Sequence, residues 1–267
     1  MAWGEKGPES VVGGIASDPQ SQLDVCAEAF NSVADRYDDD FTNRGEIRTL
    51  RQAVLHRLRT SLCPPQSILD VGCGTGEDAL HLARAGFHVT CTDSAPQMLQ
   101  IAQHKLEAYH HRVEFYLVDH QSLTRCAKLK NLKFDGILSN FGALNTLSSL
   151  SPVKTLCDSF LRPGGYVFFC LINRFYLREL LKGEWRRLRG KTAIVRCGGR
   201  EVSIHYHSPE AFKWPGYTVL QILGLSVFLR SDVHSRWPLN RLGDHFLIIL
   251  RKANLNHRDR DEKASPL

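Results

Sequence analysis

The sequence predicts an α/β fold of three layers, in which a mostly parallel, seven-stranded sheet lies between helices and the last strand runs antiparallel. Two observations predict it. Short apolar segments alternate with segments of helical periodicity, as expected of strands joined by crossover helices. The first of these strands runs directly into a glycine-rich loop, and a helix begins just beyond the loop. Such a loop brings a bound ligand close to unpaired N–H groups at the helix N-terminus.

The glycine-rich loop follows the predicted strand at 68–71, and its glycines occupy every second position. It comprises Gly72, Gly74 and Gly76, with Cys73 between the first two and Asp70 two residues before the first. Glycine lets the backbone turn sharply and lets a ligand lie close to it. The spacing differs from the G-x-G-x-x-G fingerprint of nicotinamide-binding proteins. We expect a nucleotide-like cofactor here, and we expect Cys73 to be present because it is small rather than as a nucleophile.

The next two predicted strands each lead to an aspartate. The segment 88–92 is followed by Asp93, and the segment 113–118 is followed by Asp119 and His120. Because the carboxyl ends of parallel strands share one edge of the sheet, these side chains are expected near the glycine loop. Asp93 is placed to accept the two hydroxyls of a ribose. A strand-end aspartate can instead cap a helix, and capping is the alternative for both carboxylates.

The helix after the second strand carries a start signal in the sequence. Ser94 and Gln97 predict a capping box, with Pro96 in the first turn. The buried stripe of this helix is expected to consist of Met98, Leu99, Ala102 and Leu106.

The remaining strands complete the predicted sheet. A fourth strand at 134–138 leads to Asn140, which either orients an acceptor or caps the loop, since Asn favours turns. A turn at 161–165 precedes the fifth strand, at 166–172. The closing strands are expected at 217–223 and 245–250, preceded by a short helix at 208–213.

In their order, these landmarks resemble the motifs of the class I S-adenosylmethionine (SAM) methyltransferases, which have a Rossmann-like sheet. Asp70 and the three glycines match the family motif D/E-x-G-x-G-x-G, and the segment from Phe30 to Asp38 matches the family's F-x-x-x-A-x-x-Y-D lid helix. The resemblance covers roughly residues 28 to 172 and resumes near the C-terminus. It implies SAM as the cofactor and methyl transfer as the activity.

The resemblance also implies roles for individual residues. The three glycines would cradle the methionine part of SAM, with Asp70 near its amino group. Asp93 would hold the ribose, Asp119 would bind the adenine amino group, and Tyr37 would close over the cofactor. The expected lining of the cofactor site is completed by Cys73, Ser94, His120 and Asn140.

The family commonly walls its acceptor site with an insertion after the fifth strand, and here that insertion is 173–206. It contains a basic amphipathic helix within 174–191 and a hairpin with arms at 192–196 and 201–206. We favour a pocket lid for the helix, and the alternatives are peripheral contact with a membrane surface and nucleic-acid binding. The insertion carries four aromatic residues that indicate a pocket for a small apolar or aromatic acceptor, namely Phe175, Tyr176, Trp185 and Tyr206.

An acceptor hydroxyl or ammonium would need a general base, and the histidines are the candidates. We take His120 as the candidate catalytic residue, with His205 and His207 as alternatives. His205 and His207 are two residues apart on a predicted strand, a spacing that suits a metal ion. Because no third ligand is evident, we expect no metal.

Length and composition limit the organisation of the chain. With 267 residues, 43% of them hydrophobic, it is expected to form one domain over 21–252 between a loose segment, 1–20, and a disordered tail, 253–267. No segment has the length of a transmembrane helix, and the first residues lack the apolar block of a signal peptide. Eight scattered cysteines without a C-x-x-C pair indicate free thiols in a reducing cytoplasm.

These observations together predict a SAM-dependent methyltransferase that acts on a small organic acceptor. The net charge of +6 is mild, so nucleic acid is not the expected partner. Two alternatives stay open: methylation of RNA or protein, and a SAM-binding partner protein without turnover. The sequence makes no prediction of the oligomeric state.

Overall fold

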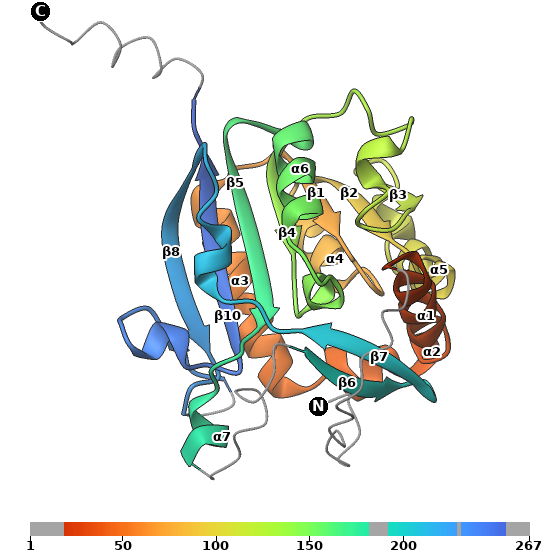
Figure 1. Cartoon of the computed structure of the whole chain (residues 1–267). Coiled ribbons are helices and arrows are strands. Elements are labelled where there is room, and N and C mark those ends of the chain that lie inside the picture. The colour runs from red at the N-terminus through yellow and green to blue at the C-terminus, as the bar shows by residue number, and fades with distance from the viewer. Residues whose placement is uncertain (1–18, 182–191, 229–230, 255–267) are drawn as a thin grey trace, which may run out of the picture.

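The computed structural model describes residues 19–181, 192–228 and 231–254 (Figure 1). These residues build an eight-stranded sheet with the order β3-β2-β1-β4-β5-β10-β8-β9. The strands are β1 (Ser67–Val71), β2 (His88–Asp93), β3 (Val113–Leu117), β4 (Phe134–Ser139), β5 (Leu161–Ile172), β8 (Tyr217–Leu225), β9 (Val233–His234) and β10 (His245–Lys252). The first five are parallel, and β10 lies antiparallel between β5 and β8. The predicted mostly parallel sheet with an antiparallel last strand is therefore confirmed, with the two-residue β9 added at one edge.

Helices cover both faces of the sheet, which completes the three layers. One face packs against α3 (Gly45–Ser61), α4 (Glu77–Arg84) and α5 (Pro96–Lys105), and the other packs against α6 (Ser151–Phe160). Side chains of β5 alternate between the two cores: Phe168 joins the first, while Val167 and Phe169 join the second. This alternation follows from the period of two in a strand. It explains why the strands read as continuous apolar runs, since both of their faces are buried.

The N-terminal helices and a separate hairpin lie over the edge where the parallel strands end. The helices are α1 (Pro19–Asn31), α2 (Ala34–Tyr37) and the π-helix η1 (Asp38–Thr42). The hairpin pairs β6 (Thr192–Cys197) with β7 (Arg200–His205), as predicted to within one residue. Helix α1 packs on this hairpin through a small apolar cluster that includes Cys26, Ala29 and Val202 (Figure 1). Two segments that are far apart in the sequence therefore form one cover.

The start of β5 differs from the sequence prediction. Residues 161–165, expected to form a turn, belong to β5, and the register with β4 shifts between Phe134 and Gly136. Gly164 has a φ of 78°, and a Cβ at Gly165 would lie 2.9 Å from the carbonyl oxygen of Asp135. The glycines therefore produce a bulge within a paired strand rather than a turn before it.

Helix α6 begins at Ser151 with Leu150 as its N-cap, and no side chain caps it. Other helical segments differ from the sequence prediction. The segment predicted as a short helix at 208–213 is a 3₁₀ turn, η5 (Pro209–Phe212), in which Phe212 is fully buried. Of the predicted basic helix, the structure describes α7 (Leu177–Leu181), and the remainder, 182–191, lies outside the described residues.

All eight cysteines lie in described segments and are free thiols. Within the described ranges, no helix combines the length and the apolar character needed to cross a bilayer.

Candidate functional site

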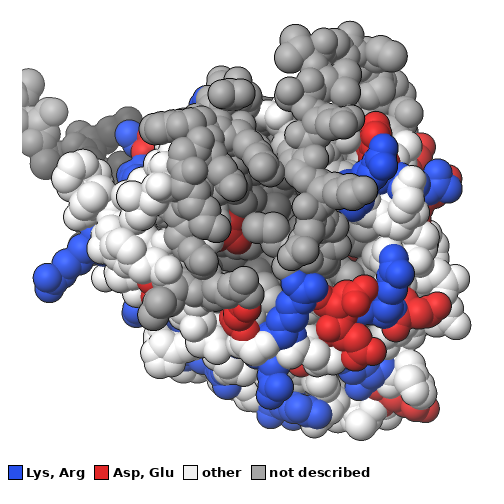
Figure 2. Space-filling model, turned by 90° about the horizontal axis from the view of Figure 1, so that it is seen from below, with Lys and Arg blue, Asp and Glu red and all other residues white. Residues whose placement is uncertain are grey.

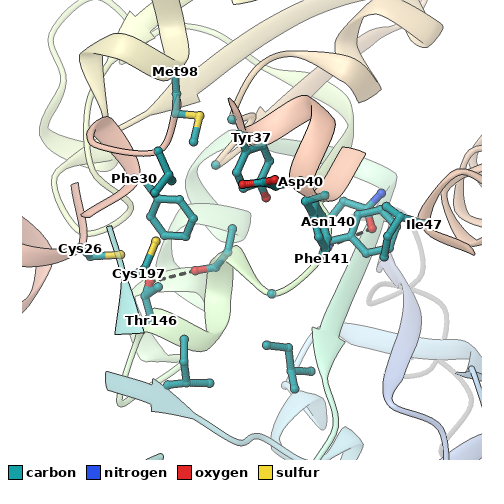
Figure 3. Close-up of a pocket in the computed structure, with 18 of the residues that line it drawn as sticks. Cys26, Phe30, Tyr37, Asp40, Ile47, Met98, Asn140, Phe141, Thr146 and Cys197 are labelled. Atoms are coloured by element: carbon teal, nitrogen blue, oxygen red, sulfur yellow. Dashed lines mark hydrogen bonds between the residues drawn. The ribbon is translucent and has the colours of Figure 1, made fainter. Parts of the chain in front are cut away.

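A cavity of about 900 Å³ opens along the edge of the sheet where the parallel strands end. Its lining follows the strand order, from Asp119 after β3 and Asp93 at the end of β2 to Asn140 after β4 and His245 at the start of β10. The N-terminal helices and the hairpin form the opposite wall, where Figure 3 shows Phe30, Tyr37 and Cys197 around the open space, with Met98 of α5 beside them. The structure thus brings the predicted strand-end residues together in one site. We call the part at β1–β3 the first half and the part at β5, β10 and β8 the second half.

The glycine loop forms the floor of the first half. The N–H groups of Gly72 and Cys73 both donate to the carbonyl of Thr92, at 2.8 and 3.0 Å, which ties the loop to β2. A Cβ at Gly72 would lie 2.6 Å from Cβ of Ala143, so packing alone requires glycine there. Gly74 has a φ of 54°, and a Cβ built on it meets nothing within 4 Å. The loop therefore leaves open space at its second glycine, where a ligand can approach the backbone.

Asp93 holds the loop and the following turn at once. Its Oδ2 accepts from the N–H of Gly74 at 2.8 Å, and its Oδ1 accepts from the N–H of Ala95 at 2.9 Å. Burial raises the pKa of this carboxyl group, although both backbone hydrogen bonds act against the increase. Asp93 also lines the cavity, so it belongs to the site in addition to holding the loop and the turn.

The predicted capping box at Ser94 is wrong. Ala95 is the N-cap of α5, and no side-chain cap is formed there. Instead, Asn31 of α1 accepts from the N–H of Gln97 through its Oδ1 at 2.9 Å. The capping oxygen comes from a residue 66 positions away, which a local pattern could not reveal. Ser94 itself lines the cavity beside Asp93.

Asp119 and His120 close the first half at the end of β3. Oδ1 of Asp119 accepts from the N–H groups of Gln121 and Ser122, at 2.8 and 2.9 Å. Burial acts to raise the pKa of Asp119, but hydrogen bonds from Ser122 and Gln121 hold that pKa below its ordinary value. Burial lowers the pKa of His120, although the charges of Asp93 and Asp119 oppose this. His120 is therefore neutral near pH 7, and its ring faces Gly72.

Three buried polar atoms around the loop have no hydrogen-bond partner among the described residues. They are Oδ2 of Asp70, Nη1 of Arg51 and Oγ1 of Thr42. Burial, followed by the charges of Asp78 and Asp93, raises the pKa of Asp70 well above its ordinary value. A buried carboxylate oxygen and a buried guanidinium nitrogen without partners are both costly, and a ligand with an ammonium and a carboxylate group would satisfy them.

A buried polar network that the sequence did not reveal lies directly behind the loop. Nε of Arg51 donates to Asp78 at 3.1 Å, and Nδ2 of Asn140 donates to both carboxylate oxygens of Asp78 at 3.2 Å. Oδ1 of Asn140 accepts from the N–H of Phe141, which has a positive φ of 49°. The Arg51 guanidinium lies 5.1 Å from the Phe141 ring centroid. Asn140 therefore caps the loop, and its amide is occupied within the protein.

One signal could have pointed to this network. Arg51 occurs in helical register with Val54, Leu55 and Leu58, which are buried, so a charge falls on an apolar face. A buried charge requires a partner of opposite sign.

The lid helix is fastened to the loop by a second ionic cluster. Lys105 of α5 pairs with Asp38 at 2.7 Å and with Glu77 at 3.1 Å, and Thr75 donates to Asp38 at 2.6 Å. These contacts hold the neighbouring Tyr37 in the cavity wall (Figure 3). Hydrogen bonding from His81 and the charge of Lys105 lower the pKa of Glu77 from 4.5 to about 2, although its burial opposes this.

We expect Lys105→Met to destabilise the fold by about 1 kcal/mol at neutral pH, because the lost ion pairs are only partly buried. A lowered folded-state pKa at Glu77 stabilises the protein above pH 4.5, and this contribution is lost as the pH falls towards 2. Removing Lys105 should make that loss smaller. Urea denaturation between pH 5 and 2.5 measures both effects, with the exposed Lys130→Met as the control. Equal pH slopes in wild type and Lys105→Met would contradict the role of this cluster.

The aromatic residues that were predicted to form the acceptor pocket lie in different places. Tyr176 lines the cavity, whereas Phe175 is exposed and Tyr206 packs in the cluster between α1 and the hairpin. Trp185 lies outside the described residues. Of the histidines, His207 contacts the carbonyl of Leu147 through Nε2 at 2.9 Å. In the described segments, no group of three His, Cys, Asp or Glu side chains is arranged to hold a metal ion.

Comparisons with known proteins show that this chain is similar in sequence to methyltransferases. Residues 68–165 match the model of a family described as a methyltransferase domain. The chain is 26% identical over 205 residues to a demethylmenaquinone methyltransferase of Leptospira interrogans, covering 73% of this chain and 81% of that protein. It is 30% identical over 164 residues to a ubiquinone biosynthesis O-methyltransferase of Aromatoleum aromaticum, covering 59% of this chain and 68% of that protein.

A solved structure shares the fold. It is the 1,6-didemethyltoxoflavin-N1-methyltransferase of Burkholderia thailandensis, determined with 1,6-didemethyltoxoflavin and S-adenosylhomocysteine bound. The TM-score is 0.60 at 18% identity, and the match covers 93% of this chain and 99% of that one.

Proposed function

Because this chain belongs to the class I SAM-dependent methyltransferases and uses SAM as its cofactor, we propose that it methylates a small, hydroxylated aromatic acceptor of the quinol type. One observation carries the proposal: a single cavity of about 900 Å³ is lined by the glycine loop and strand-end carboxylates in one half and by apolar side chains in the other. One relative is named as a demethylmenaquinone methyltransferase and another as a ubiquinone biosynthesis O-methyltransferase, and the name of the second specifies methylation at oxygen.

In this proposal the first half binds the cofactor. The unsatisfied Oδ2 of Asp70 accepts from the ammonium group of the methionine part, and Nη1 of Arg51 donates to its carboxylate. The open space at Gly74 receives the same part of the molecule, between Gly72 and Gly76. Asp93 holds the ribose and Asp119 the adenine amino group, since both residues line the cavity. The lining is completed by Tyr37, Cys73, Ser94, His120 and Asn140.

The second half suits an aromatic acceptor. Its wall combines Phe141, Ile172 and Tyr176 with the underside of the hairpin at Ile204. Apolar pockets with a few polar groups are typical of sites for small organic molecules. The surface supports the same choice, because acidic and basic side chains lie next to one another on the described part of the face in Figure 2. Binding of RNA would instead be favoured by a broad basic surface.

The protein contributes to the reaction by positioning the acceptor and by excluding water. SAM supplies an electrophilic methyl group when it is bound. The chain must hold the accepting oxygen in line with that methyl group, about 3 Å away. Residues of α1, α2 and the hairpin form one wall of the cavity, which reduces the access of solvent to the reacting atoms. The acceptor hydroxyl must lose its proton, and His120, neutral and beside the cofactor half, is one candidate base.

Transfer of a radioactive methyl group tests the proposal. The full chain is incubated with methyl-labelled SAM and with catechol, 4-nitrocatechol and reduced short-chain quinones, and in parallel with total RNA and with a protein extract. We expect label in at least one aromatic product at the oxygen. Label in RNA or protein instead would contradict the acceptor class, as would SAM binding without any labelled product. The dependence on salt separates these outcomes, because RNA affinity falls steeply with ionic strength.

A further inference from the structure

His245 lies where the acceptor is expected. It is the first residue of β10, where it pairs with Ile172 at the end of β5 and with Leu225 at the end of β8. Because β10 is antiparallel, its first residue falls on the edge where the parallel strands end. His245 therefore lies in the second half of the cavity, of which it is a lining residue.

The imidazole of His245 reaches back towards β4. Its ring centroid lies 6.0 Å from that of Phe141, with the planes at 80°. Phe141 follows Asn140, which lines the middle of the cavity, between its two halves. Neighbouring strands are about 4.8 Å apart, so a backbone position two strands away would otherwise be about 10 Å from β4. The side chain thus brings a titratable ring to the junction where acceptor and cofactor meet.

A carboxylate stands behind this imidazole. Nδ1 of His245 lies 3.2 Å from Oδ2 of Asp244, and both residues line the cavity. Nδ1 is buried, and its alignment with Asp244 falls short of a hydrogen bond. Such contacts are often loose before a substrate binds and tighten in the complex. No hydrogen bond among the described residues uses Nε2 of His245, so this nitrogen is left to a ligand in the cavity.

We propose that His245, oriented by Asp244, is the general base for the acceptor hydroxyl; this rests on the proposed function. The O–H bond breaks and its proton passes to Nε2 of His245. The freed oxygen lone pair forms the bond to the methyl carbon, and the carbon–sulfur bond breaks with its electrons going to the sulfonium sulfur. The imidazolium is stabilised by the Asp244 carboxylate and later gives its proton to water.

The other histidines are less well placed for this step. His120 faces Gly72 in the first half, on the cofactor side of the loop. Nε2 of His207 is occupied by the carbonyl of Leu147. His205 contacts Thr192 through Nδ1 and is not a lining residue of the cavity. Of the four, His245 combines a position in the second half with an unoccupied nitrogen and an adjacent carboxylate.

Ionisation of a coloured acceptor tests the assignment without turnover. 4-Nitrocatechol is titrated into the full chain saturated with S-adenosylhomocysteine, at a pH below the solution pKa of the nitrocatechol. We expect wild type to bind it with the absorbance of the catecholate, because His245 takes the proton. His245→Gln should lose this spectrum, while the exposed His88→Gln should keep it.

Turnover provides the second measurement. His245→Gln should lower kcat with catechol by about 10²–10⁴-fold at an unchanged KM for SAM. The loss should be smaller with 4-nitrocatechol, which ionises more readily by itself. Asp244→Asn should lower kcat without changing the KM for SAM, as expected of a positioning residue.

The outcomes separate this inference from the proposed function. If His245→Gln keeps the catecholate spectrum and the wild-type kcat, the assignment of the base is overturned while the function stands. If wild type binds SAM but neither binds nor methylates a catechol, the acceptor class is wrong and the assignment falls with it.

Discussion

Replacing Gly74 by valine is expected to abolish SAM binding while the fold persists. The Cβ at this position meets no protein atom within 4 Å, so the added side chain would occupy the space of the cofactor. The φ of 54° also strains a β-branched residue, at a cost of about 1–2 kcal/mol. Steric exclusion from the loop should weaken SAM binding by at least about 100-fold, or 2.7 kcal/mol. Isothermal titration calorimetry measures the affinity, and thermal unfolding measures the stability.

A matched control separates strain from exclusion. Gly216 has a φ of 82° and likewise nothing within 4 Å of its Cβ, but it lies outside the cavity lining. Gly216→Val should therefore show a similar loss of stability with normal SAM affinity. Wild-type affinity in Gly74→Val would place the cofactor elsewhere. Equal losses of affinity in both variants would mean that strain, rather than occupancy of the loop, explains the effect.

The sheet could be predicted because its signals are local. Apolar runs such as that of β1, followed by glycines at alternate positions, mark both the strand and the turn beyond it. The strand-end carboxylates Asp93 and Asp119 fell together in the cavity because parallel topology brings strand ends to one edge. Hairpin register followed from Gly198 and Gly199, which both have positive φ as a tight turn requires.

The contacts that complete the site are long-range, and local patterns do not contain them. Asn31 caps a helix that begins 65 residues later, and the pairing of Lys105 with Asp38 spans 67 positions. The Arg51–Asp78 ion pair likewise joins two helices. Each depends on how α1, α3 and α5 pack over the sheet, which periodicity alone does not specify. The predicted antiparallel last strand places His245 at this edge of the sheet, but its contact with Phe141 after β4 is long-range and was not predicted.

Replacing Asp70 by asparagine is expected to stabilise the ligand-free protein and to weaken SAM binding. Its Oδ2 is buried without a partner, and Asp78 and Asp93 add repulsion. Removing the charge should raise the free energy of unfolding by about 1–3 kcal/mol at neutral pH, a few degrees in Tm. The lost charge-assisted hydrogen bond to the SAM ammonium should cost about 1.5–3 kcal/mol, or roughly 10- to 150-fold in affinity.

The pH dependence follows from the sign of the shift. The folded-state pKa of Asp70 is raised, so between its unfolded and folded pKa values the native state binds the extra proton. Wild-type stability therefore falls as the pH rises through that window, and Asp70→Asn should remove this fall. Chemical denaturation from pH 4 to 8 measures the difference. The difference in the free energy of unfolding between Asp70→Asn and wild type should increase towards neutral pH.

As a control, the same replacement at a carboxylate that already has partners should change the stability in the opposite direction. Asp135 accepts from the N–H of Ser67 at 2.9 Å and pairs with Arg162 at 2.8 Å, at the other end of the sheet. Asp135→Asn should destabilise the protein and leave SAM affinity unchanged, because its carboxylate is already paired and is remote from the cavity. If Asp70→Asn is also destabilising and binds SAM as tightly as wild type, then its carboxylate serves the fold alone. The opposed signs of stability and affinity in one variant are expected only if the unsatisfied oxygen is kept for a ligand.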